Sequence, residues 1–249
     1  MISVCMATYN GARFIRQQLE SILSQLSDGD EVIISDDGST DQTLDIIHDF
    51  NSDRIKVFQN QGEHGYTPNF ENALRHASGD YIFVSDQDDV WKPNKVSKCL
   101  DYLQDYDFIV TDAELIDARG NMTAPSFFAL RHSRSGFIHN LIRFSFIGCC
   151  MAFKRDVLVR ALPFPPNHRL CTHDNWLTLV GMGFYRGKAV DDKLIGYRRY
   201  GDNTSNGGMT DHTTIGFKLR YRLYLAFWLL RRFGASCLSL PKTDCDYHQ

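Results

Sequence analysis

The first 111 residues alternate short apolar runs with segments whose apolar residues recur at helical spacing. The runs are rich in β-branched and aromatic residues, as buried strands are. Between them the helical repeat is plain, for example from Ile15 to Leu26. This strand–helix alternation predicts a Rossmann-like, mostly parallel central sheet flanked by helices. The expected strands are 2–7, 31–35, 54–58, 80–85 and 107–111.

The second half of the chain is less regular. It shows no internal repeat and no linker before about residue 212, so we expect one α/β domain over 1–212 and a helical tail over 213–249. Residues 120–136 are expected to form loops or short elements. The expected regular elements are a strand at 144–153, a helix at 155–162, a helix opening at 173–176, and strands at 184–190 and 194–199.

Composition limits the class of protein. The 249 residues are 43% hydrophobic and 23% charged, as in an ordinary soluble globular chain. A net charge of −3 argues against a nucleic-acid binder, which usually carries a basic excess. Seven cysteines without regular spacing indicate reduced thiols rather than a disulfide framework. No signal peptide or membrane-spanning run is visible, so we expect a cytoplasmic protein.

Three carboxylates follow the expected strand at 80–85: Asp86, Asp88 and Asp89. Crowding them is unfavourable unless a cation or water compensates their charge. A solvated acidic turn is the alternative to a divalent metal site. Ligands bind at the carboxyl ends of parallel strands, and two other polar turns, 8–11 and 36–41, are expected at that edge. The three turns together favour a shared site.

These turns and one later motif resemble the family-2 glycosyltransferases, which have the GT-A fold. The resemblance covers about residues 2–205 and depends on the order of the motifs. The string Ser85–Pro93 is most similar to a rhamnosyltransferase-like branch that builds bacterial O-antigen or capsule chains. In chain order the motifs are Ala7–Gly11, Asp36–Asp41, Ala77–Ile82 leading into Asp86–Asp89, and His173–Trp176.

The resemblance implies roles for the matching residues at the donor. Thr8 and Tyr9 are expected at the nucleotide, with Tyr9 against the base, and Asp37 is expected to accept a hydrogen bond from the imide nitrogen of the base. Asp86 is expected to contact the donor ribose or the metal. Asp88 is expected to hold Mn²⁺ or Mg²⁺ bridging the diphosphate. A hard divalent cation prefers such oxygen ligands and shares them with substrate phosphates.

Asp174 matches the catalytic base of the family, where the common pattern is Glu-Asp rather than the His173-Asp174 found in this chain. The resemblance implies a single displacement with inversion, in which this carboxylate takes the proton of the acceptor hydroxyl. Local sequence also allows Asp174 to be a helix N-cap and His173 to be a surface histidine. Arg198 and Arg199 resemble a segment that closes over the donor diphosphate, and a basic strand end is the alternative.

The implied function is transfer of a sugar from a UDP- or dTDP-sugar to a saccharide acceptor. That acceptor is expected to be linked to a polyprenyl diphosphate lipid. Two alternatives are a non-catalytic nucleotide-sugar-binding protein and an aspartyl-phosphate phosphohydrolase. The phosphohydrolase usually has a nucleophilic Asp after its first strand, where this chain has Ala7-Thr8-Tyr9.

Two further features leave alternatives open. Segment 217–232 has five basic residues and no acidic one, which is typical of a helix that binds an anionic membrane surface, here the inner membrane. A helix packed on the core is the other interpretation. Cys149, Cys150, Cys171 and His173 have unsuitable spacing for zinc, so buried thiols are favoured.

Overall fold

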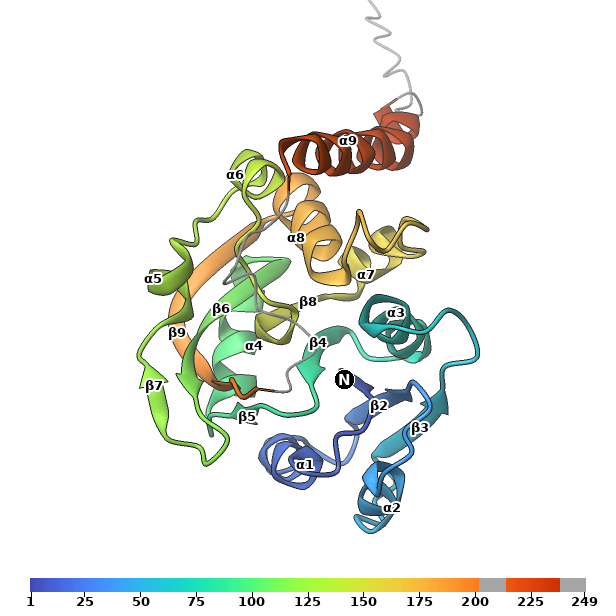
Figure 1. Ribbon diagram of the computed structural model, residues 1–249, viewed down its shortest axis with the longest axis vertical. Coiled ribbons are helices and arrows are strands. Elements are labelled where there is room, and N and C mark those ends of the chain that lie inside the picture. The colour runs from blue at the N-terminus through green and yellow to red at the C-terminus, as the bar shows by residue number, and fades with distance from the viewer. Residues whose placement is uncertain (202–213, 238–249) are drawn as a thin grey trace, which may run out of the picture.

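The computed structural model describes residues 1–201 and 214–237 (Figure 1). Within these residues nine strands form one curved sheet, with the order β3-β2-β1-β4-β8-β6-β9-β5 and with β7 paired to β6. The strands are β1 Ile2–Thr8, β2 Glu31–Asp36, β3 Ile55–Gln59, β4 Tyr81–Asp86, β5 Val90–Trp91, β6 Phe108–Ile116, β7 Met122–Ala124, β8 Met151–Lys154 and β9 Gly187–Arg198.

Helices cover the sheet and carry the connections. They are α1 Ile15–Leu23, α2 Thr43–His48, α3 Tyr66–His76, α4 Lys95–Asp105, α5 Phe127–Arg131, α6 Phe137–Ile142, α7 Arg155–Ala161, α8 His173–Phe184 and α9 Ile215–Cys237, with a 3₁₀ turn, η1, at Gly148–Cys150. None of those in residues 1–201 and 214–237 is both long and apolar enough to span a bilayer.

The parallel half of the sheet aligns the carboxyl ends of its strands. β1 pairs in parallel with β2 and with β4, so Thr8 lies opposite Asp36 and Ala7 lies opposite Asp86. β2 and β3 are also parallel, and β6 is parallel to β9. β8 is antiparallel to both β4 and β6 and joins the two groups. The predicted mixed, mostly parallel sheet is confirmed.

The core lies on both faces of the sheet. All six residues of β2 are buried, as expected of a strand covered on both sides. Apolar side chains of α1, including Ile15, Leu19 and Ile22, join the same cluster. Five cysteines whose side chains the structure describes are buried free thiols, as the sequence favoured: Cys5, Cys99, Cys149, Cys150 and Cys171.

Three sequence-based expectations about local structure were wrong. The strand expected at 144–153 begins only at Met151, because Gly148–Cys150 turns as η1. The two strands expected at 184–190 and 194–199 are one strand, β9, since β6 supplies pairing along its length. The spacing of Ser39 and Gln42 also predicts a capping box at the start of α2, but it does not form, because the Ser39 hydroxyl donates to Asp36 instead.

Helix α9 packs on the rest of the domain through one face. Leu225, Leu229 and Phe233 are buried in the main apolar cluster. Arg232 donates to the carbonyl oxygen of Arg160 at 3.0 Å, which ties α9 to α7. The core-packed interpretation therefore holds for this face. The expected boundary at 212/213 lies outside the described residues, because these stop at 201 and resume at 214.

Candidate functional site

One cleft of about 1180 Å³ opens at the carboxyl edge of the parallel strands. The turns after β1, β2 and β4 line it, and η1 and the start of α8 close its other side. Most residues predicted from the sequence line this cleft, and the described part of its lining does not include Arg198 or Arg199. The predicted residues that line it are Thr8, Tyr9, Asp37, Asp86, Asp88 and Asp174.

Gln87 locks the first turn to the third. The Tyr9 N–H donates to Gln87 Oε1 at 2.9 Å, and Gln87 Nε2 donates back to the Tyr9 carbonyl at 3.0 Å. A Cβ on Gly11 would overlap the Gln87 amide, so this turn needs a glycine there. The Tyr9 ring itself is half exposed at the cleft. The sequence-based interpretation passed over Gln87, and its only signal was its place between two functional carboxylates.

The two adjacent carboxylates of the second turn have different tasks. Asp36 is buried and accepts the Thr8 hydroxyl at 3.0 Å and the Ser39 N–H at 2.8 Å, which shapes the turn. Asp37 lines the cleft and accepts from Asn60 Nδ2 at 2.7 Å and from the Gly65 N–H at 2.8 Å. These bonds hold the Asp37 carboxylate in one orientation at the expected nucleotide end of the cleft.

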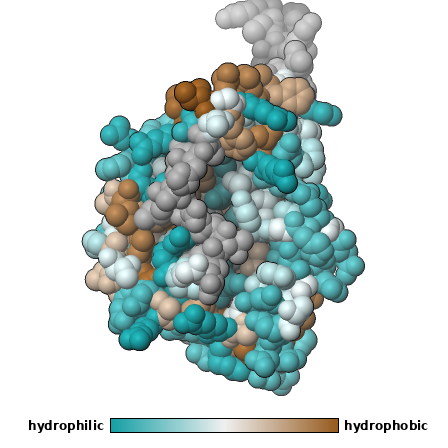
Figure 2. All heavy atoms as spheres, in the orientation of Figure 1, coloured by the Kyte–Doolittle hydropathy of each residue, from teal (hydrophilic) through white to brown (hydrophobic). Residues whose placement is uncertain are grey.

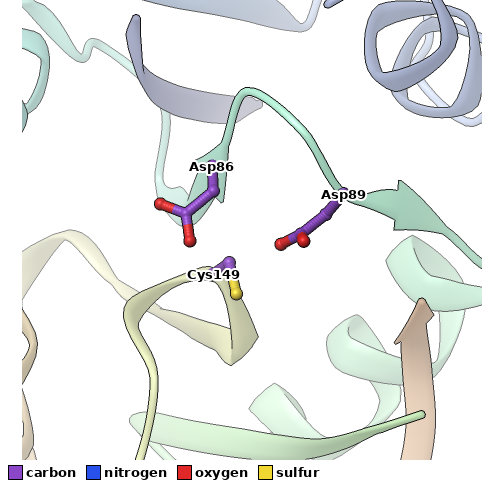
Figure 3. Close-up of side chains that lie close together, drawn as sticks. All are labelled: Asp86, Asp89 and Cys149. Atoms are coloured by element: carbon purple, nitrogen blue, oxygen red, sulfur yellow. The ribbon is translucent and has the colours of Figure 1, made fainter. Parts of the chain in front are cut away.

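The third turn gathers the acidic cluster. Asp86 and Asp88 line the cleft, whereas Asp89 is fully buried beside it. Figure 3 shows the side chains of Asp86 and Asp89 above Cys149 in the view, and one ligand atom of each of the three residues lies within 4.8 Å of the others. These three side chains form one cluster that could hold a metal ion, and Asp86 also lines the cleft together with Asp88.

Electrostatics favours a cation on the cleft side, at Asp86 and Asp88, over one that uses Cys149 as a ligand. Burial, together with the charge of Asp88, raises the pKa of Asp86 from 3.8 to about 7, and Asp174 adds to the shift. Burial raises the pKa of Cys149 well above its ordinary value, so this thiol stays protonated. A protonated thiol is a poor ligand for a hard cation, which prefers carboxylate oxygens. Asp86 and Asp88 therefore fit a divalent cation shared with a ligand in the cleft.

Residues at the end of β9 hold the acidic turn in place through hydrogen bonds. Arg198 is almost fully buried, and its Nε donates to the Asp88 carbonyl at 2.7 Å. The Arg198 N–H donates to Asp89 Oδ1 at 2.9 Å. Tyr200, which lines the cleft, donates its hydroxyl to Asp88 Oδ2 at 2.8 Å. A contact between Arg198 or Arg199 and a diphosphate stays a prediction.

Asp174 lies in the first turn of α8, with its side chain at the cleft. The N-cap is Thr172, so the interpretation of Asp174 as the cap was wrong. The Thr172 hydroxyl donates to Asp174 Oδ1, and the Asn175 N–H donates to the same oxygen at 2.8 Å. Burial raises the pKa of both Asp86 and Tyr66, and the negative charge of Asp174 adds to the rise of each. Asp174 therefore faces the acidic turn across the cleft.

His173 is buried, with 5% of its surface exposed, so the surface-histidine interpretation was wrong. Its ring stacks on Phe70, with the centroids 4.1 Å apart. Its Nε2 occupies the space that a Cβ on Gly148 would need. Burial lowers the pKa of His173, although Asp174 opposes the shift. The neutral imidazole thus packs η1 against α3 and α8 and supports the position of Asp174.

Several curated proteins are similar to this chain. A glycosyltransferase from Nostoc sp. is 29% identical over 81% of the chain and 66% of its own length. The UDP-Glc:alpha-D-GlcNAc-diphosphoundecaprenol beta-1,3-glucosyltransferase WfgD of Escherichia coli is 26% identical over 76% of each protein. The dTDP-rhamnosyl transferase RfbG of Shigella flexneri is 27% identical over 87% of the chain and 77% of its own length. The chain thus spans just under two thirds of the Nostoc protein and about three quarters of the other two.

Solved structures share the fold. TarS of S. aureus in complex with UDP-GlcNAc superposes with a TM-score of 0.66 at 20% identity, over 96% of this chain and 74% of that one. The mannosyltransferase PcManGT of Pyrobaculum calidifontis, in complex with GDP-Man and Mn²⁺, gives 0.59 at 21% identity, over 96% and 64%. The family model described as "Glycosyl transferase family 2" matches residues 3–161. With its motifs gathered at one cleft, the chain belongs to glycosyl transferase family 2 and has the GT-A fold.

Proposed function

We propose that the protein transfers a sugar, with inversion, from a UDP- or dTDP-sugar to a saccharide acceptor in bacterial surface polysaccharide synthesis. One observation carries this proposal: the acidic pair Asp86 and Asp88 faces Asp174 across a single cleft. Asp37 lies in the lining of the same cleft. A nucleotide, a cation and a catalytic base thus have candidate partners within one cavity.

The nucleotide end is assigned to the first two turns. Tyr9 lies against the base, Thr8 supports the turn beneath it, and Asp37 accepts the imide N–H. This assignment is supported by the rigid hold on Asp37 from Asn60 and Gly65. Arg199 is assigned to the diphosphate side, since arginine donors match phosphate geometry, and Arg198 is assigned to hold the acidic turn in place through its bonds to Asp88 and Asp89.

The metal is assigned to Asp88 and Asp86. The carboxylates on the cleft side fit a divalent cation, because burial and then the charge of Asp88 raise the pKa of Asp86, and a cation there would offset both effects. Mn²⁺ or Mg²⁺ held there would neutralise charge on the nucleoside diphosphate. The PcManGT complex with GDP-Man and Mn²⁺ is in line with this assignment.

Asp174 is assigned as the general base. Thr172 and Asn175 hold its Oδ1, and among the described residues no hydrogen bond to its Oδ2 is recorded. Oδ2 takes the proton of the acceptor hydroxyl as that oxygen bonds to the anomeric carbon. The bond from the anomeric carbon to the diphosphate oxygen breaks on the opposite side, and the nucleoside diphosphate leaves. This displacement inverts the anomeric centre.

The acceptor is assigned as a saccharide on a polyprenyl diphosphate, at the cytoplasmic face of the inner membrane. The name of WfgD, which specifies a diphosphoundecaprenol-linked sugar, supports this class of acceptor. In this proposal residues 1–212 form the catalytic part, and the tail from residue 213 brings it to the membrane through segment 217–232.

Nucleoside diphosphate release from a panel of UDP- and dTDP-sugars tests the proposal. Release is measured with Mn²⁺ or Mg²⁺, with and without a lipid-diphosphate-linked sugar acceptor. We expect one donor to turn over only when both a metal and the acceptor are present. Tight donor binding without transfer to any acceptor would instead identify a non-catalytic nucleotide-sugar-binding protein. The family match does not favour the phosphohydrolase alternative.

A further inference from the structure

Helix α9 has two apolar faces, and the domain covers one of them. Leu225, Leu229 and Phe233 are buried. A second row follows at spacings of four, four and three residues, which keeps its members on one side of the helix. Its members are exposed by 56 to 72%: Leu219, Leu223, Phe227 and Leu230. A contiguous row of large apolar side chains in water indicates an interaction surface.

Helix α6 extends this surface. Ile138 is 63% exposed and Ile142 is 55% exposed. Arg222 of α9 donates through Nε to the Ile142 carbonyl at 3.2 Å, so the two helices are joined where their apolar residues meet. Figure 1 places α6 and α9 at the same end of the molecule, and Figure 2 shows brown, apolar atoms gathered there. The docking face consists of Ile138, Ile142, Leu219, Leu223, Phe227 and Leu230.

The segments that carry the docking face are free of acidic residues. The chain has a net charge of −3, yet residues 118–155 contain six Lys or Arg and no Asp or Glu. Residues 215–237 contain five Lys or Arg and again no acidic residue. Arg134, Arg143 and Arg220 are exposed on these segments. Such local basic charge on an acidic protein is complementary to an anionic surface.

We propose that the docking face lies on an anionic lipid surface. Its leucines, isoleucines and Phe227 enter the boundary of headgroups and acyl chains, and the arginines beside them contact lipid phosphates. The combination of an apolar row with basic flanks selects a membrane rather than a protein partner of neutral charge.

The docking face also continues toward the cleft. Phe144, which follows Ile142 almost directly in the chain, lines the cleft together with Arg131 of α5. A chain docked in this way would have one cleft wall close to the lipid surface. The purpose of docking rests on the proposed function, because it delivers a lipid-linked acceptor to Asp174, whereas the docking itself does not depend on catalysis.

Vesicle flotation of the full chain, without donor or acceptor, tests the proposal. We expect the wild type to float with phosphatidylglycerol/phosphatidylcholine vesicles and not with phosphatidylcholine vesicles alone. Leu223→Asp should lower the bound fraction about tenfold or more, because a leucine side chain leaves the apolar layer. Met122→Asp is the matched control and should float like the wild type, since Met122 is 60% exposed on β7, away from α9.

A charge variant and a fold control complete the test. Arg220→Gln should weaken binding about fivefold on the anionic vesicles. All variants should keep the wild-type unfolding midpoint. Equal flotation of Leu223→Asp and Met122→Asp, or no flotation of the wild type, would overturn the proposal. So would a wild-type dimer that Leu223→Asp turns into a monomer without any vesicle binding. A chain that floats as expected but releases no nucleoside diphosphate would contradict the proposed function and leave docking intact.

Discussion

At the scale of single residues, Asp88 is the proposed metal ligand that a single substitution tests most simply. Asp88→Asn should abolish metal-dependent release of nucleoside diphosphate, because an amide is a much weaker ligand for a hard cation. Release measured across a Mn²⁺ titration checks this. The matched control is Asp80→Asn, at the start of the same segment, where Asp80 is exposed and pairs with the chain amino group at 3.1 Å. Equal Mn²⁺ dependence in both variants would remove Asp88 from the metal site.

Gly148 offers a second test at this scale, on the position of Asp174. A Cβ at this position would overlap His173 Nε2. Gly148→Ala should therefore displace the His173 ring and the start of α8, lowering the free energy of unfolding by about 1–3 kcal/mol. Turnover should fall further than the loss of stability alone explains, because the carboxylate of Asp174, the proposed base, moves from its position at the cleft. Gly29→Ala is the control, since nothing lies within 4 Å of its added carbon.

The roles of individual residues were predictable only where a local motif carried them. The carboxylates of the second and third turns stand in short strings beside expected strands, so Asp37, Asp86 and Asp88 could be placed at one sheet edge. The burial of His173 could not be foreseen, because it depends on Phe70 and Gly148, which are distant in sequence. The same reason applies to Gln87, whose partner Tyr9 lies in another turn.

At the scale of elements, the end of β9 ties two turns and helix α1 together through one side chain. Arg198 donates to the carbonyl of Asp88 at 2.7 Å, to that of Asp117 at 3.1 Å and to Gln17 Oε1 at 2.8 Å. Hydrogen bonds from a charged donor contribute about 1.5–3 kcal/mol each. Arg198→Ala should therefore lower the free energy of unfolding by about 3 kcal/mol or more.

Urea unfolding of the wild type, Arg198→Ala and Arg199→Ala measures this loss of unfolding free energy. Arg199 is only half-buried, so Arg199→Ala should lower the free energy of unfolding less than Arg198→Ala does. If Arg198→Ala keeps wild-type stability and loses only donor affinity, contact with the diphosphate is its main role and the structural account of the β9 end is wrong.

The elements of the first half were predictable because their signals are local. Apolar runs and helical repeats alternate there without interruption, and the first four strands, β1 to β4, pair with one another. In the second half the signals conflict. Asp191 and Asp192 interrupt the apolar pattern of β9, yet the strand continues because β6 pairs with both of its ends. Aromatic residues before Gly148 favoured a strand where packing requires a turn.

At the scale of the whole molecule, we expect the acidic cluster to couple metal binding to stability. The pKa of Asp86 is raised to about 7 in the folded protein from an ordinary 3.8. Between these values the folded chain keeps a proton that the unfolded chain has released, so the metal-free protein loses stability as pH rises. The raised pKa values of Asp88 and Asp89 act in the same direction.

Calorimetric melting measured without metal and with Mn²⁺ tests this coupling. From about pH 5 to about pH 8 the melting temperature should fall less for Asp86→Asn than for the metal-free wild type. Mn²⁺ should raise the melting temperature of the wild type more near the upper end of this pH range, where the carboxylates are ionised. If the melting temperature of Asp86→Asn falls with pH as steeply as that of the wild type, the acidic cluster is not the source of the pH dependence.

The central claim is that Asp174 is the base of a glycosyl transfer in this cleft, and Asp174→Asn measures it most directly. Donor binding is followed by calorimetry with Mn²⁺, and transfer by nucleoside diphosphate release in the presence of acceptor. The variant should bind the donor as tightly as the wild type while transfer falls about a hundredfold or more, since the amide cannot take a proton. Near-normal turnover in Asp174→Asn would contradict the account.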